Sequence, residues 1–143
     1  MFLPKAAAFT AKEEGFRGKM YKDTKGILTI GYGFNLEALE MPDSVAFLWM
    51  QILLEECAQD LRRLFPKFDT FSANRQTALL DIRYNLGARG LRGFPSAVRA
   101  VNADNWTEAI AQFKYRKPPS TDLSGWYTDH IARSERVLKL LEG

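Results

Sequence analysis

Three residues near the start of the chain have the types and spacing of a small hydrolytic site. These are Glu14, Asp23 and Thr29, with eight residues between the first two and five between the last two. A protonated carboxyl group can protonate the leaving oxygen of a glycosidic bond while an ionised carboxylate activates water or stabilises positive charge. A threonine hydroxyl donates and accepts hydrogen bonds, so it can help to hold that water. The three types together suit hydrolysis of a glycosidic bond.

The elements expected around these residues place the two carboxyl groups on different supports. Residues 2–14 carry apolar side chains at helical spacing, so Glu14 is expected at the end of a short helix. Residues 15–35 are rich in glycine and in residues that favour strands, and a turn-forming stretch divides them. We therefore expect a hairpin with Asp23 at its turn and Thr29 on the returning strand, able to fold back over the helix end.

From Pro42 onward the apolar pattern has a helical period. The first half of the longest predicted helix is apolar nearly all round, which predicts that this helix runs buried through the centre of the protein. Together the elements indicate a mainly α, α+β chain with a helical lobe and one small hairpin lobe. The predicted helices cover residues 44–65, 73–86 with a stop at Gly87, 95–102, 106–115, and a last helix capped by Ser124 that ends near Leu141.

Length and composition fit one globular domain of 143 residues. The hydrophobic share of 46% and the charged share of 26% exclude a disordered or collagen-like chain. One cysteine excludes an intrachain disulfide, and one cysteine with one histidine argues against structural zinc. Residues 1–60 carry a net charge of −3 and residues 61–143 a net charge of +6. A basic second half suits an anionic polymer, such as nucleic acid, an acidic membrane surface or bacterial cell wall.

Two further patterns concern membranes and export. No apolar run approaches the length of roughly 18 residues that a membrane span needs. The first residues lack the apolar core and the small-residue cleavage site of a signal peptide. We therefore expect no stable membrane insertion, synthesis in the host cytoplasm without a signal peptide, and release by a route that another component supplies.

The stretch EGFRGKMYKDTKGILTIGYGF, residues 14–34, resembles the catalytic signature of the phage-type lysozymes, the muramidases of glycoside hydrolase family 24. Three later segments are also similar to that family: the run from Tyr84 to Phe94, the helix that starts at Trp106, and the last helix. The resemblance covers about residues 9–140. It implies a single lysozyme-like domain over residues 1–143, with a small hairpin lobe at about 15–41 and a helical lobe formed by residues 1–14 and 42–143, joined by a long central helix.

The resemblance also assigns roles to residues. It implies that Glu14 is the general acid, that Asp23 positions or activates the attacking water, and that Thr29 helps to hold it. The family inverts the anomeric carbon, which implies carboxyl groups about 6.5–9.5 Å apart. An arginine on the last helix, here Arg133, is expected to pair with the catalytic glutamate. Residues at positions that line the family's sugar cleft are Tyr84, Asn85, Gln112 and Lys117.

The chain departs from the family pattern at three points. Phe34 stands where many relatives have histidine, which removes a possible histidine–carboxylate pair that supports the hairpin. The segment between Leu36 and Pro42 is short, so we expect a minimal small lobe. Glu13 beside Glu14 offers a second acid, but a helix points the two side chains roughly 100° apart and the spacing favours Glu14.

The function that the resemblance implies is cleavage of the β-1,4 bond between N-acetylmuramic acid and N-acetylglucosamine in peptidoglycan, without a metal or cofactor, by a monomer that acts on the cell wall during bacterial lysis. Three alternatives stay open. A lytic transglycosylase would use Glu14 alone and leave Asp23 idle. A non-catalytic module would bind the wall without cutting it. A nucleic-acid-binding domain would suit the basic second half, but no recognised motif supports it.

Overall fold

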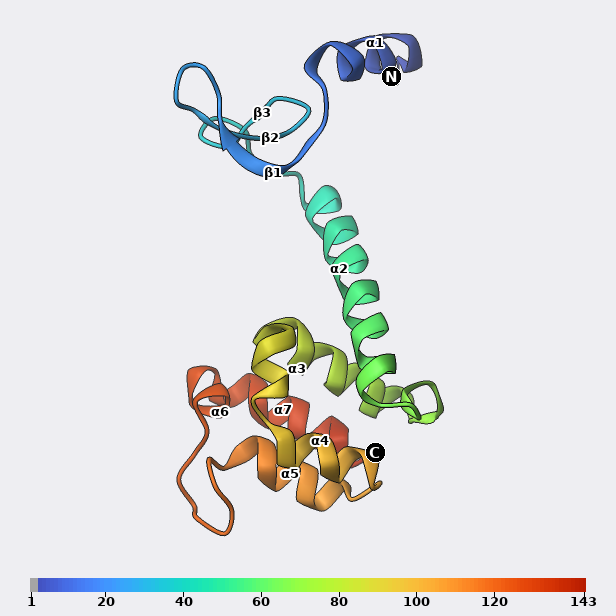
Figure 1. The fold of residues 1–143 in the computed structure, drawn as a ribbon, viewed down its shortest axis with the longest axis vertical. Helices are drawn as coiled ribbons and strands as arrows, with labels where there is room; N and C mark the ends of the chain where they lie inside the picture. The colour runs from blue at the N-terminus through green and yellow to red at the C-terminus, as the bar shows by residue number, and fades with distance from the viewer. Residues whose placement is uncertain (1–2) are drawn as a thin grey trace. The chain divides into compact units, whose positions relative to one another are not determined.

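The structure is a computed structural model that describes residues 3–143. Its contacts divide the chain into two compact units, one that ends at Ala46 and one from Phe47 to Gly143. Seven α-helices, one 3-10 helix and a three-stranded antiparallel sheet are found in the described part (Figure 1). This confirms the predicted mainly α, α+β, lysozyme-like fold.

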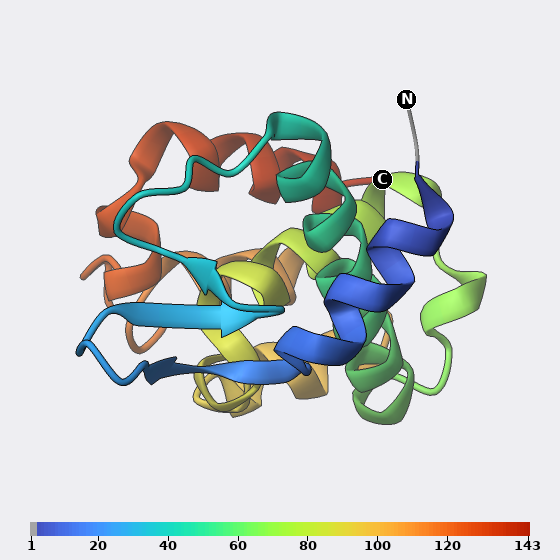
Figure 2. The same cartoon turned by 90° about the horizontal axis from the view of Figure 1, so that it is seen from above.

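The first unit contains helix α1 (Pro4–Glu14) and strands β1 (Arg17–Lys22), β2 (Leu28–Gly31) and β3 (Phe34–Asn35). Pro4 begins α1, where a proline costs no hydrogen bond and its fixed φ suits the helix. The helix leads through Gly15 directly into β1 (Figure 2). Its C-cap, Gly15, has a φ of 68°, a conformation that favours glycine and lets the chain leave the helix abruptly.

The sheet has one strand more than the predicted hairpin. The order is β1-β2-β3, with Thr29 opposite Tyr21 on one side and opposite Asn35 on the other. Positive φ values at Gly31 and Gly33 turn the chain back on itself after β2, and this allows β3 to pair. Thr29 therefore lies on the central strand, paired on both edges, rather than on the edge of a two-stranded hairpin.

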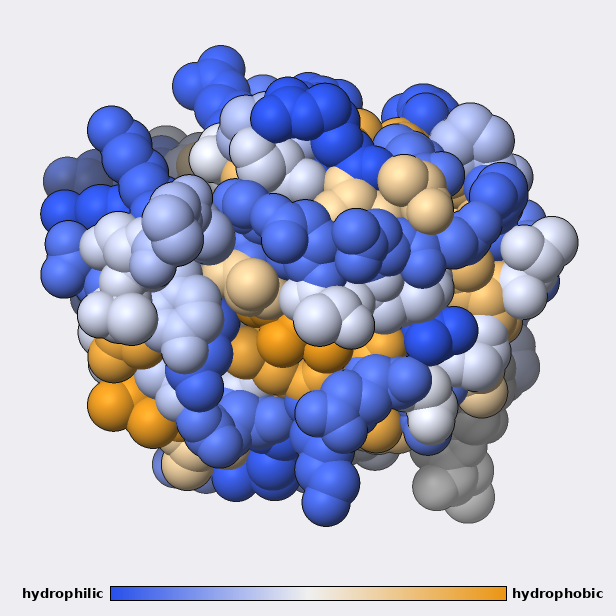
Figure 3. Space-filling view, turned by 90° about the horizontal axis from the view of Figure 1, so that it is seen from below, coloured by the Kyte–Doolittle hydropathy of each residue, from blue (hydrophilic) through white to orange (hydrophobic). Residues whose placement is uncertain are grey.

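Helix α2 (Asp43–Leu64) spans the predicted range, and its two halves differ in burial. Only Cys57, Ala58 and Leu61, all in its second half, are buried. In the first half, Phe47 is 55% and Leu48 58% exposed. Elements of the second unit cover only the second half of this helix, and the burial predicted for its first half stays a prediction. Apolar side chains also remain on the surface elsewhere, among mostly hydrophilic ones (Figure 3).

The second unit is helical and holds the hydrophobic core. Its largest fully buried side chains include Phe65, Phe113, Leu79 and Ile82. Helix α4 lies beside α5, and α3 lies beside α7 (Figure 1). Its elements after α2 are η1 (Phe68–Thr70), α3 (Ala73–Arg92), α4 (Pro95–Asn102), α5 (Trp106–Lys114), α6 (Gly125–Asp129) and α7 (Ile131–Leu141).

Side-chain caps begin three of these helices as the sequence predicts. The side-chain oxygens of Ser72, Asn105 and Ser124 each accept a hydrogen bond from a backbone N–H three residues later. The stop at Gly87 is also confirmed, since its φ of 72° interrupts α3. The predicted last helix is instead two, because the backbone of His130 is not helical and separates α6 from α7.

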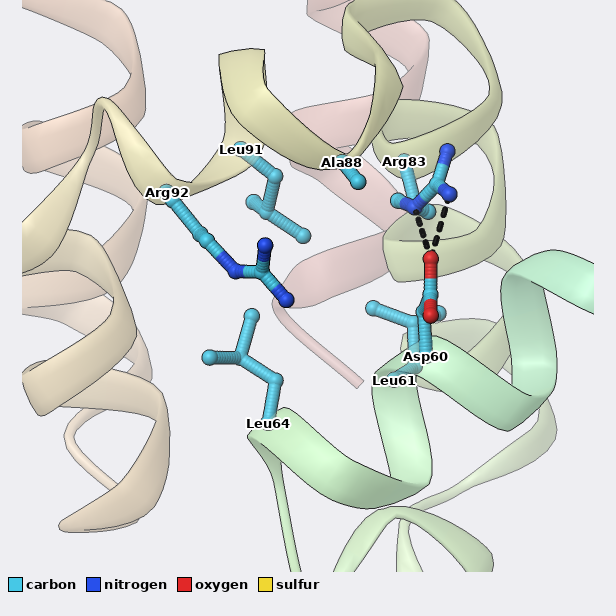
Figure 4. A pocket seen from close by; sticks show the side chains of 7 residues that line it. All are labelled: Asp60, Leu61, Leu64, Arg83, Ala88, Leu91 and Arg92. Atoms are coloured by element: carbon cyan, nitrogen blue, oxygen red, sulfur yellow. Dashed lines mark hydrogen bonds and ion pairs between the residues drawn. The ribbon is translucent and has the colours of Figure 1, made fainter.

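One ion pair inside the second unit ties α2 to α3. The Arg83 guanidinium donates two hydrogen bonds to Asp60, one of them from Nε at 3.1 Å (Figure 4). Apolar side chains of Leu61, Leu64 and Leu91 lie around the pair. The hydrogen bonds from Arg83 hold the pKa of Asp60 below its usual range. Asp60 should therefore stabilise the folded state through its charged form.

We expect replacement of Arg83 by glutamine to reduce the free energy of unfolding at pH 7 by about 1–2 kcal/mol, since the carboxylate loses hydrogen bonds from a charged donor. A carboxyl group whose pKa is lowered by folding stabilises the protein at pH values above its unfolded pKa of about 3.9. This stabilisation is lost as the pH falls through the folded pKa. Urea unfolding should show less loss of stability between pH 5 and pH 2 in R83Q than in wild type. R63Q is the control, because Arg63 contacts the same carboxylate from an exposed position. An equal effect of both variants would contradict the assignment.

None of the helices in residues 3–143 is long and apolar enough to cross a membrane. Over the same residues, His, Cys, Asp and Glu side chains form no group of three that could hold a metal ion.

Candidate functional site

Glu14 is the last residue of α1, and its exposed side chain lies against the turn between β2 and β3. An added Cβ at Gly33 would lie 2.6 Å from Oε2 of Glu14. The Glu14 carboxyl group therefore packs against the backbone of Gly33, in space that only glycine leaves free. Gly33 also has a φ of 72°, which a side chain would strain. Sequence reasoning did not single out Gly33, although the Gly-Tyr-Gly run was a signal of close backbone approach.

Asp23 lies in the loop between β1 and β2, where its side chain is half-buried. Oδ1 accepts hydrogen bonds from the backbone N–H groups of Lys25, at 2.8 Å, and Ile27, at 2.9 Å. Its backbone N–H also donates to the carbonyl of Ile27. Within residues 3–143, Oδ2 has no hydrogen-bond partner. One carboxylate oxygen thus fixes the group, and the other can accept a hydrogen bond from water.

Thr29 is buried, with 4% of its surface exposed, and its hydroxyl donates to the carbonyl of Ile27 at 3.0 Å. This hydrogen bond uses the single hydroxyl proton and leaves the oxygen able to accept. Asp23 and Thr29 therefore both hold Ile27, one through its N–H and the other through its C=O. The first unit contains all three predicted catalytic residues, with Asp23 and Thr29 joined through one residue and Glu14 against Gly33.

The remaining predicted site residues belong to the second unit. Tyr84, 42% exposed, and Asn85 lie on α3 just before the interruption at Gly87. Gln112 and Lys117 line one cavity. The structure thus places these four residues at two locations in that unit, one on α3 and one at the end of α5.

Arg133 pairs with a carboxylate of its own unit. Its Nε and Nη2 donate to the two oxygens of Asp81 at 3.1 and 2.7 Å, so the pair is bidentate and joins α7 to α3. The Asp81 carboxylate raises the pKa of Arg133 further above its usual range. Sequence reasoning missed Asp81 as a partner, because the two residues are 52 positions apart and no local pattern connects them. The role of Arg133 toward a catalytic glutamate stays a prediction.

The chain matches one known protein family over most of its length. The family model described as phage lysozyme matches residues 11–126, which include Glu14, Asp23 and Thr29. The chain belongs to the phage lysozyme family. It is therefore a lysozyme-like peptidoglycan hydrolase.

Two curated relatives agree with this membership in the phage lysozyme family. The chain is 23% identical to "Probable T4-type lysozyme 2" of Dictyostelium discoideum, over 91% of this chain and 89% of that protein. It is 24% identical to "Pre-baseplate central spike protein Gp5" of Enterobacteria phage T4, over 94% of this chain. The match spans only 27% of the spike protein, so this chain corresponds to one part of it.

The contact between Glu14 and Gly33 leads to a prediction for this lysozyme. Replacement of Gly33 by alanine should displace the Glu14 carboxyl group and lower the rate of wall hydrolysis by roughly 10–100-fold, since a shift of about 1 Å at a reacting group can cost 10²-fold. Purified peptidoglycan serves as the substrate, and released reducing ends are counted.

Gly26→Ala is the matched control for Gly33→Ala. Gly26 also has a positive φ, of 80°, but no heavy atom lies within 4 Å of an added Cβ. Both variants should lose about 1–3 kcal/mol of stability from backbone strain, and only G33A should lose most of its activity per folded molecule. Equal activities for the two folded variants would show that the Gly33 contact does not position Glu14.

Proposed function

We propose that this peptidoglycan hydrolase is a muramidase that cleaves the β-1,4 bond between N-acetylmuramic acid and N-acetylglucosamine. The observation that carries the proposal is the arrangement inside the first unit. The Glu14 carboxyl group lies against Gly33, and Asp23 is fixed through one oxygen while the other is free to contact water. The resemblance to "Probable T4-type lysozyme 2" over 89% of that protein supports the proposal.

In the proposed reaction Glu14 gives its proton to the glycosidic oxygen as the bond from the anomeric carbon breaks. A water molecule attacks the same carbon from the opposite face of the sugar, and Asp23 takes a proton from it. Thr29 accepts a hydrogen bond from that water, since its hydroxyl already donates its proton to the carbonyl of Ile27. The products are a new reducing end of inverted configuration and a free hydroxyl on the leaving sugar.

Other residues have proposed supporting roles. Tyr84, Asn85, Gln112 and Lys117 contact the glycan, and Arg133, already oriented by Asp81, supports the acid. We also propose that residues 1–143 work as one lysozyme-like domain and that the protein is a monomer which needs no cofactor. Its site of action is the bacterial cell wall, and the result of its activity is lysis.

The experiment that tests this function is hydrolysis of purified peptidoglycan in water enriched in oxygen-18. Mass spectrometry should find reducing muramic acid ends that carry one oxygen-18 atom, and NMR of the fresh product should find the inverted anomer. Anhydro-muramic ends without the isotope would instead identify a lytic transglycosylase. Binding to the wall without any new ends would identify a non-catalytic module.

A further inference from the structure

Tyr21 lies directly opposite Thr29 where strands β1 and β2 pair. Residues that face each other across two antiparallel strands project from the same face of the sheet, with Cβ atoms about 4.5–5.5 Å apart. The half-buried Tyr21 side chain therefore leaves the sheet on the face that carries the Thr29 side chain. Asp23 follows Tyr21 by two residues, directly after the end of β1. Tyr21 is thus the neighbour of both residues that the proposed reaction uses to bind water.

The phenol hydroxyl of Tyr21 is free to form a hydrogen bond. The guanidinium carbon of Arg17 lies 4.3 Å from the centroid of the Tyr21 ring, which is a cation–π contact. This contact uses a face of the ring and leaves the phenol oxygen unoccupied. Among residues 3–143, the Tyr21 hydroxyl has no hydrogen-bond partner, and the Arg17 side chain forms no ion pair.

The attacking water of the proposed reaction needs one more hydrogen-bond partner. One of its hydrogens points to Asp23, the other to the oxygen of Thr29, and one lone pair attacks the anomeric carbon. Its second lone pair is left to accept from a donor. Thr29 does not supply that donor, because its hydroxyl proton already goes to the carbonyl of Ile27. Asp23 does not supply it either, since a carboxylate only accepts.

Two side chains flank Thr29 on the same face of the sheet, and one of them is already engaged. Asn35 faces Thr29 from β3. Its Oδ1 accepts hydrogen bonds from the backbone N–H groups of Glu37, at 2.9 Å, and Ala38, at 3.1 Å. These bonds engage the Asn35 side chain with the turn that follows β3. Tyr21, on the opposite side of Thr29, has a hydroxyl with no such engagement.

We propose that Tyr21 is a further catalytic residue, whose hydroxyl donates a hydrogen bond to the attacking water. The inference rests on the proposed muramidase reaction and deepens it. The phenol proton stays on Tyr21 throughout, while the water loses its proton to Asp23. The hydrogen bond directs the other lone pair of the water at the anomeric carbon, so it acts on the rate of attack. Arg17 is a positioning residue, because it contacts the ring and not the water.

The first test compares Tyr21→Phe with Tyr32→Phe on soluble, uncross-linked peptidoglycan strands. Each variant loses one phenol oxygen and keeps its ring. Tyr32 is the matched control, since it lies in the same unit but packs against Phe16, with ring centroids 5.4 Å apart. We expect Y21F to lower kcat about 10-fold, the effect of roughly one hydrogen bond, and to leave KM and thermal unfolding unchanged. Y32F should keep the wild-type kcat and KM.

A double-mutant cycle tests the positioning role of Arg17. R17Q should lower kcat about 3-fold, as expected for the loss of one exposed cation–π contact. R17Q/Y21F should have the same kcat as Y21F, because the position of the ring no longer matters once its hydroxyl is gone. K19Q, which removes another exposed cation of β1, should have the wild-type kcat.

Three results would overturn the inference. Y21F with the wild-type kcat would exclude Tyr21 as the donor to the water. Y21F with a raised KM and an unchanged kcat would show that the hydroxyl contacts the glycan instead. A further loss of about 3-fold in R17Q/Y21F, relative to Y21F, would show that Arg17 does not act through Tyr21.

The oxygen-18 experiment separates this inference from the proposed function. If wild type releases reducing ends that carry the isotope and Y21F has the wild-type kcat, the inference fails and the muramidase function stands. If wild type releases anhydro ends without the isotope, no water attacks the sugar. The proposed function then fails, and the role of Tyr21 toward that water fails with it.

Discussion

Replacing Glu14 by glutamine should reduce the release of reducing ends from purified peptidoglycan by about 10²–10⁴-fold, the range that general acid catalysis contributes. Glutamine keeps the size of the side chain and its packing against Gly33, but it has no acidic proton to give to the leaving oxygen. The change should lower kcat and leave sedimentation with the insoluble wall unchanged, because the exposed side chain adds little to stability or to binding.

The control for this variant is Glu13→Gln. Glu13 is also exposed at the end of α1 and has the same charge, but helical geometry points it about 100° away. We expect E13Q to retain wild-type activity, so that the contrast isolates position rather than net charge. An E14Q protein that still hydrolyses the wall at the wild-type rate would remove Glu14 from the mechanism, and with it the muramidase proposal.

Asp23 should give the second large effect, and here two variants separate chemistry from structure. Asp23→Asn keeps an oxygen that can accept from the N–H groups of Lys25 and Ile27, so the loop should stay intact. It removes the negative charge that receives the water proton. We expect wall hydrolysis to fall about 10²–10³-fold, within the range for a general base, with thermal unfolding shifted little.

Asp23→Ala removes both the charge and the two loop hydrogen bonds. It should lose as much activity as D23N, and in addition about 1–2 kcal/mol of stability from the two lost hydrogen bonds, one of which is exposed to solvent. Urea unfolding measures the second effect independently of catalysis. A D23N protein with full activity would assign Asp23 to loop structure alone and favour the transglycosylase alternative, which needs only Glu14.

Much of the local structure follows from neighbouring residues. The apolar spacing in residues 2–14 and the strand- and turn-forming residues in 15–35 predicted a helix end at Glu14, a turn at Asp23 and a returning strand at Thr29. The structure has each residue in the predicted element. Caps at Ser72, Asn105 and Ser124 and the interruption at Gly87 were also predictable. These features depend on contacts within about four residues, and the local sequence determines such contacts.

Other features depend on which distant segments meet, and the tertiary structure alone decided them. Arg133 is paired with Asp81 because α7 lies beside α3. The Glu14 carboxyl group fits because Gly33, 19 positions later, lacks a side chain. Within the second unit only the second half of α2 is buried, since burial depends on what packs against a helix and not on its own composition. Residue types and spacing predicted the chemistry of the site, whereas long-range packing decides which contacts position its side chains.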